Sequence, residues 1–186
     1  MLDKESRTAL DDYRSLEVRV GVLMRGICRP FCLACDTICC RIEICQEAWE
    51  SPFLNAIGSG TQRFHSSRGY LGATGCRLQT GRPSICHRFI CDRIMQGQTN
   101  DIHQYGLRCL GDLMGFAGKK VWRGKHPAAA PLEADLHEIN IRRFRHQIAT
   151  AEAALEILDN LFTRNICPGV DDIGVLAQIY KPSMPP

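Results

Sequence analysis

Long hydrophobic runs are missing from this sequence of 186 residues, and so are other signs of a membrane or secreted protein. No stretch of about 18 uncharged apolar residues occurs, so no membrane-spanning helix is expected. The first residues, Met-Leu-Asp-Lys-Glu-Ser-Arg, are charged and lead into no apolar segment, which argues against a secretory signal. We therefore expect a cytoplasmic protein that does not enter a membrane.

Internal repeats and runs of alternating polar and apolar residues are also missing, so few strands are expected. Apolar residues at helical spacing instead predict a helix over 5–26, which Pro30 ends or bends. Further helices are predicted over 101–114 and after Arg82-Pro83, the latter carrying Cys86 and Cys91. The predicted fold class is mainly α, with helices around an irregular, cysteine-rich metal-binding core and a long C-terminal helix.

The strongest helical pattern covers residues 132–164, where apolar side chains form a continuous stripe. One helix of this length would be roughly 45–50 Å long. Its stripe either packs on its own domain or pairs with a protein partner, including a second copy in a homodimer. The sequence thus divides into a cysteine-cluster domain over 1–118, a connector over 119–131, and the long helix with its tail over 132–186.

Charge of one sign is scarce, since the net charge is only +3. A nucleic-acid partner is therefore not expected. The basic residues from 25 to 93 are nonetheless all arginine. Their guanidinium groups could offset the negative charge of a thiolate-bound metal, or they could reflect a genomic preference for arginine codons.

Cysteine, by contrast, is abundant, with eleven in the chain and nine of them between positions 28 and 91. A cytosolic protein keeps its thiols reduced, so clustered cysteines indicate metal binding or redox chemistry rather than disulfides. Cys45, Cys109 and Cys167 stand apart from the two main blocks and are interpreted as ordinary small apolar residues.

The two blocks supply the candidate metal ligands. Two residues between Cys32 and Cys35 let one turn direct both sulfur atoms at one ion. Adjacent side chains diverge, so Cys39 and Cys40 are not both expected to bind the same ion. The second block contributes ligands from a distant part of the chain, as closed tetrahedral sites require. The candidate ligands are Cys28, Cys32, Cys35, Cys39, Cys40, Cys76, Cys86 and Cys91.

The same residues resemble a known family, the YkgJ-type cysteine-cluster proteins, which are zinc- or iron-chelating domains. The resemblance covers about residues 28–94 and includes Cys32 to Cys40, the Gly75-Cys76 pair with Leu78, and the Arg82-Pro83-x-x-Cys86 element followed by Phe89 and Cys91. Three residues rather than two separate Cys35 from Cys39, His87 stands where arginine is usual, and Cys28 could replace a ligand missing near Cys76. The resemblance implies metal chelation and, through flagellin lysine methylase relatives, allows an iron–sulfur cluster.

Thiolate ligation suits both zinc and iron, and more cysteines are present than one zinc ion needs. The expected cofactor is therefore an iron–sulfur cluster or zinc. The predicted function is a metal-binding cysteine-cluster protein with a structural, redox or metal-handling role. Two alternatives remain open: an enzyme whose iron–sulfur cluster has an open coordination position, and a metal-free thiol redox protein that uses Cys32 and Cys35.

Overall fold

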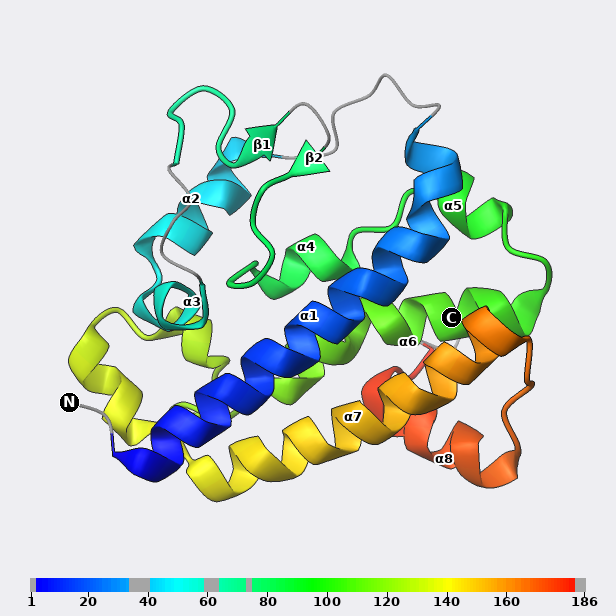
Figure 1. The fold of residues 1–186 in the computed structure, drawn as a ribbon. Helices are drawn as coiled ribbons and strands as arrows, with labels where there is room; N and C mark the ends of the chain where they lie inside the picture. The colour runs from blue at the N-terminus through cyan, green and yellow to red at the C-terminus, as the bar shows by residue number, and fades with distance from the viewer. Residues whose placement is uncertain (1–2, 34–40, 59–63, 73–74, 183–186) are drawn as a thin grey trace.

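Helices account for most of the chain in a computed structural model, which describes residues 3–33, 41–58, 64–72 and 75–182 (Figure 1). Among these residues, the only paired strands are β1 and β2, which form a short antiparallel hairpin. The prediction of a mainly α fold with a long C-terminal helix is confirmed. The elements are α1 (Lys4–Cys32), α2 (Ile42–Glu50), α3 (Pro52–Ile57), β1 (Leu71–Gly72), β2 (Gly75–Cys76), α4 (Ser84–Arg88), α5 (Asp92–Gln96), α6 (Asp101–Ala117), η1 (Pro127–Ala129), η2 (Glu133–Glu138), α7 (Ile141–Arg164) and α8 (Val170–Ile179).

Helix α1 is longer than the sequence predicted, because it runs through Pro30 to Cys32. The Asp3 side chain caps its start by accepting a hydrogen bond from the Ser6 N–H at 2.8 Å. Proline removes the bond to the carbonyl four residues earlier, here that of Gly26. Gly26 is exposed, and a Cβ atom added there would have nothing within 4 Å, so water can solvate that carbonyl. Cys28 and Cys32 consequently lie on a helix rather than in a loop.

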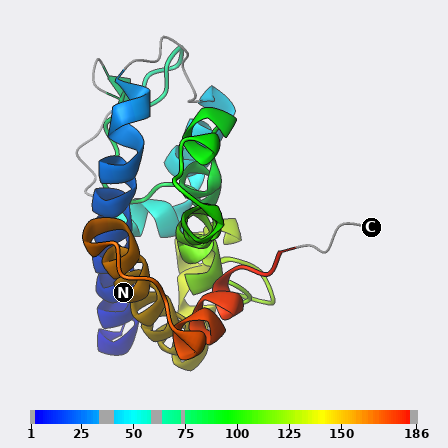
Figure 2. The same ribbon diagram turned by 90° about the vertical axis from the view of Figure 1, so that its right-hand side faces the viewer.

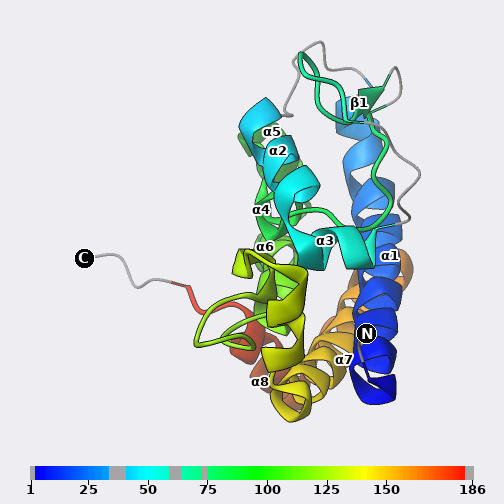
Figure 3. The same ribbon diagram turned by 90° about the vertical axis from the view of Figure 1, so that its left-hand side faces the viewer.

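Apolar side chains of α1, α6 and α7 meet in one core, and α8 packs against α6 and α7 (Figures 1 and 2). Its aromatic centre is the Tyr13 ring, whose centroid lies 5.3 Å from that of Phe53 and 5.5 Å from that of Phe144. Helix α3 packs against both α1 and α2, and it lies between them in Figure 3. The fully buried core includes Ala9, Leu16, Leu107, Leu110, Leu113, Leu155 and Leu158.

The predicted continuous helix over 132–164 is wrong at its start. Residues 133–138 form the 3₁₀ helix η2, and α7 begins at Ile141. The Asn140 side chain accepts a hydrogen bond from the Arg143 N–H at 3.0 Å and thereby caps α7. With 24 residues, α7 is about 36 Å long. Its apolar stripe packs on α1 and α6 of its own chain.

Residues 119–131, predicted as a connector, lead from α6 to η2 and contribute to the same core. Val121 and Ala130 are buried, and Trp122 is 5% exposed. His126 packs its ring edge-on against Tyr13 and Phe53. Withdrawal of this imidazole from water lowers its pKa to about 4, so the ring is neutral at physiological pH. Within the described part of the chain, no helix is long and apolar enough to cross a membrane.

Candidate metal centre

The described cysteines of the two blocks lie on several different elements, which Figure 1 labels. Cys28 and Cys32 lie on α1, Cys76 lies on β2, and Cys86 lies on α4. Cys91 precedes α5 as its N-cap residue. The predicted helix after Arg82-Pro83 therefore carries Cys86 but ends at Arg88, before Cys91. Three predicted ligands, Cys35, Cys39 and Cys40, lie outside the described residues.

One group of thiols combines the two blocks. Cys28 and Cys32 are four residues apart on α1, so they share one face of the helix. The pKa of the Cys28 thiol is raised to about 11, first by burial and then by the nearby Cys32 and Cys91 thiols. Cys91 comes from the second block, so the fold brings together residues more than 60 positions apart. Thiolates so close together would repel one another, and a cation bound among them would offset that repulsion.

A second group of thiols lines a pocket of about 400 Å³ between α2, β2 and α4. Cys76 and Cys86 were predicted ligands, whereas Cys45 was interpreted as an ordinary apolar residue. Cys45 is buried on α2 and contacts the turn at Gly69, where a Cβ atom would lie 2.6 Å from the Cys45 Sγ. The pKa of Tyr70 is raised by burial and then by Cys45 and Cys76. Cys45 is thus a candidate that spacing alone did not identify.

Arginine and apolar side chains form the rest of this pocket. Arg41 and Arg82 line it together with Ile44, Leu78 and Phe89. The Arg82 Nε donates a hydrogen bond to the Leu78 carbonyl at 2.6 Å, which fixes the direction of its side chain. No acidic side chain is among the described residues that line the pocket. Its electrostatic character therefore favours anionic groups, including thiolates.

A buried carboxylate, that of Glu17 on α1, contacts the segment that contains the second cysteine block. Glu17 is 1% exposed, and its Oε2 accepts a hydrogen bond from the Gly81 N–H at 2.8 Å. Its Oε1 accepts a hydrogen bond from the Arg82 N–H at 2.9 Å and lies 3.1 Å from the His87 Nε2. His87 is 3% exposed. His87 is thus engaged by Glu17 through Nε2.

The turn that leads into α4 is held against α3. Gly81 adopts a φ of 77°, and a Cβ atom there would lie 2.5 Å from the Leu54 carbonyl oxygen. Only glycine fits both the backbone conformation and the close approach. The neighbouring Thr80 hydroxyl donates a hydrogen bond to the Ile57 carbonyl at 3.1 Å. The backbone before Cys86 is therefore tied both to α1 and to α3.

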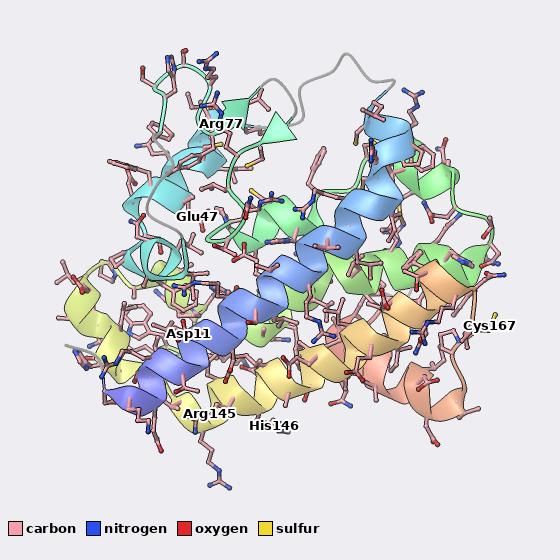
Figure 4. All side chains as sticks on the ribbon, in the orientation of Figure 1. Asp11, Glu47, Arg77, Arg145, His146 and Cys167 are labelled. Atoms are coloured by element: carbon pink, nitrogen blue, oxygen red, sulfur yellow. The ribbon has the colours of Figure 1, made fainter. Side chains whose placement is uncertain are left out.

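Cys109 and Cys167 belong to neither group. Cys109 is fully buried on α6, and its Sγ lies 3.9 Å from the Leu176 carbonyl oxygen. Burial raises its pKa to about 12, as expected for a thiol in an apolar core. Cys167 is exposed between α7 and α8, far from the Arg77 that follows Cys76 (Figure 4).

Across residues 3–33, 41–58, 64–72 and 75–182, no three His, Cys, Asp or Glu side chains are arranged to hold a metal ion. Six of the described cysteines instead form two separate groups: Cys28, Cys32 and Cys91 in one, and Cys45, Cys76 and Cys86 in the other. The segment 34–40, which contains Cys35, Cys39 and Cys40, connects Leu33, next to the first group, with Arg41 of the pocket.

Comparison of the chain with protein-family models, with curated proteins and with solved structures gave no match. The resemblance to YkgJ-type proteins therefore stays a prediction from the spacing of the cysteine blocks. The sequence contained a signal for Glu17 that the predictions did not use. Position 17 falls on the apolar stripe of α1, between Tyr13 and Val20, where an acidic residue requires buried partners.

Proposed function

We propose that this chain holds an iron–sulfur cluster or zinc through cysteine thiolates, as a metal-binding protein with a structural, redox or metal-handling role. The observation that carries the proposal is the meeting of Cys28 and Cys32 with Cys91, from the other block. Thiols from distant segments that converge at one surface are what a thiolate metal site needs. The predicted ligand Cys35, with one of the adjacent Cys39 and Cys40, would complete the coordination.

The surroundings of the cysteines support the same proposal. Thiolates bound to a metal leave net negative charge, and the guanidinium groups of Arg41 and Arg82 lie at the pocket shared by Cys76 and Cys86. The raised pKa of Cys28 means that this thiol stays protonated at neutral pH until a cation displaces its proton. Metal binding should therefore release protons and strengthen as the pH rises.

A metal-free thiol redox protein is the second candidate, because the Cys32 and Cys91 thiols lie close enough to Cys28 to raise its pKa. The exchanging pair predicted from the sequence is Cys32 and Cys35, and Cys35 lies outside the described residues. Thiol–disulfide exchange requires a thiolate as the attacking group. A Cys28 pKa of about 11 leaves very little thiolate at neutral pH. The same pKa presents no obstacle to a metal, which deprotonates its ligands on binding, and metal binding is therefore preferred.

The test is to purify the protein without oxygen, record its visible spectrum, and measure zinc, iron and acid-labile sulfide per chain. A brown protein with sulfide supports an iron–sulfur cluster, and a colourless one with stoichiometric zinc supports a zinc site. Cys91→Ser should lose the metal, whereas the matched control Cys109→Ser, at a buried cysteine outside the groups, should keep it. A folded wild-type protein without zinc, iron or sulfide would refute the proposal.

A further inference from the structure

We propose that Glu17 is a positioning residue of the thiolate site. Glu17 would fix where the segment with Cys86 and Cys91 packs along α1. This inference rests on the proposed metal-binding function. Glu17 acts through the residues that it engages directly, Gly81, Arg82 and His87. Its role would be to align the second cysteine block with the first.

The three hydrogen bonds explain why a carboxylate occupies a buried position. A charged group withdrawn from water destabilises the fold unless each oxygen has good partners. Glu17 finds them in two backbone N–H groups and one imidazole nitrogen, all between 2.8 and 3.1 Å away. All three belong to the segment that leads into and forms α4. The carboxylate therefore needs residues 81–87 to stay buried, and these residues need the carboxylate to stay in place.

Glu17 and Cys28 lie on nearly the same face of α1. They are eleven residues apart, which is about three helical turns with an angular difference of about 20°. The axial separation is about 16 Å at 1.5 Å per residue. Gly21 and Met24 occupy the same face between them. One face of α1 thus carries the carboxylate at one point and a candidate ligand three turns further on.

The chain from His87 to Cys91 meets α1 at both of these points. His87 bonds to Glu17, and Cys91 lies near Cys28. Helix α4 ends at Arg88, and residues 89–91 are not helical. Cys91 follows His87 by only four residues. Displacement of the His87 end would therefore shift Cys91 as well.

A first test needs no metal. In Glu17→Gln the carboxamide keeps one acceptor oxygen but places an amide donor against a group that already donates. We expect the alkylation rate of Cys91 by N-ethylmaleimide to rise about tenfold, since losing one charge-assisted hydrogen bond favours local opening by about that factor. Rates would be read for each cysteine by mass spectrometry. Cys109, buried in the α6 core, reports global unfolding within the same sample.

A second test measures zinc affinity by competition with a chelator. Loss of a residue that orients metal ligands typically weakens binding by about 10- to 100-fold, and this range is expected for Glu17→Gln. The matched control is Leu158→Ala, which opens a cavity in the core formed with α7. This variant lowers the global stability without touching α4. It should bind zinc with unchanged affinity.

Equal increases in the alkylation of Cys91 and Cys109 would overturn the proposal, because Glu17 would then support the fold as a whole. Unchanged alkylation of Cys91 in Glu17→Gln would overturn it as well. A selective rise at Cys91 supports it. If that rise occurs in a protein whose wild type binds neither zinc nor iron, the positioning role stands and the proposed metal-binding function fails.

Discussion

The two halves of α1 have different surroundings. Residues 4–16 bury Ala9, Tyr13 and Leu16 in the core with α6 and α7. Residues 17–32 begin with a buried carboxylate and end with Cys28 and Cys32 next to the second cysteine block. We call the first, together with α6, α7 and residues 119–131, the core half, and the second, together with residues 75–96, the cysteine half. Apolar packing holds the first. The second also buries apolar side chains, Val20 and Leu23, but adds the Glu17 hydrogen bonds and, in our proposal, metal ligation.

One continuous helix, α1, thus joins two regions that are stabilised by different interactions. Apolar packing does not depend on a ligand. A thiolate site is stable only with its metal, whose binding free energy becomes folding free energy. The two halves should therefore respond separately to metal removal, to cavity-forming substitutions and to pH.

Metal removal should produce the largest effect, and it should be confined to the cysteine half. Structural zinc sites contribute about 10 kcal/mol or more of apparent binding free energy. Chelation should lower the amide hydrogen-exchange protection of residues 75–96, which the Glu17 hydrogen bonds still hold in part, while α6 and α7 stay protected. Exchange followed by mass spectrometry, with and without chelator, measures this. Equal loss of protection in α7 would show that the two halves fold as one unit.

Phe144→Ala should have the converse effect on the core half. The Phe144 ring is fully buried and packs on Tyr13 and Phe53. Removing a buried phenylalanine side chain costs about 3–5 kcal/mol. The free energy of unfolding, measured in urea, should fall by this amount, while the metal content per folded chain stays the same. A loss of metal in the folded variant would contradict the separation.

Acidification should weaken the core half through His126. The folded-state pKa of about 4 lies below the unfolded value of about 6.5, so the unfolded chain binds the proton more tightly. The stabilising contribution is complete above pH 6.5 and is lost as the pH falls toward 4. The loss amounts to at most about 3 kcal/mol. Urea unfolding of metal-free protein between pH 7 and 4 should show this slope, which His126→Phe should reduce.

Gly81→Ala should cause the smallest of these changes in stability, in the cysteine half. The residue needs a φ of 77°, and an added Cβ would clash with the Leu54 carbonyl oxygen. Such strain costs about 1–3 kcal/mol. We expect a modest fall in thermal stability and a larger relative fall in zinc affinity. Gly124→Ala, also at a positive φ but with open space around the Cβ, is the control for backbone strain alone.

The sequence predicted the core half well. The spacing of apolar residues predicted the apolar stripes of α1 and α7, because the apolar face of each helix packs on neighbouring helices. It overestimated the long helix, since the Asn140 cap ends the continuity between η2 and α7. It also ended α1 too early, because Pro30 falls in the last turn beside an exposed Gly26, where the missing hydrogen bond costs little.

The candidate site was predicted only in part. Cysteine spacing identified Cys28, Cys32 and Cys91, which the fold brings together. It did not identify Cys45, because a single cysteine on a helix resembles any small apolar residue. Glu17 was also missed, since its partners are 64 to 70 positions away and two of them are backbone groups. Such contacts leave no pattern in the residue types around position 81.

The eleven-residue interval between Glu17 and Cys28 fixes both the axial separation of the two side chains and their relative direction around the α1 axis. Inserting one residue between them would turn Cys28 by about 100° and carry it away from Cys91. Inserting four would restore the direction to within about 40° but push the thiol about 6 Å further along the axis. Neither insertion would alter the apolar packing of the core half. Length variation in this protein should therefore be tolerated in the turns between helices, and hardly at all within this stretch of α1.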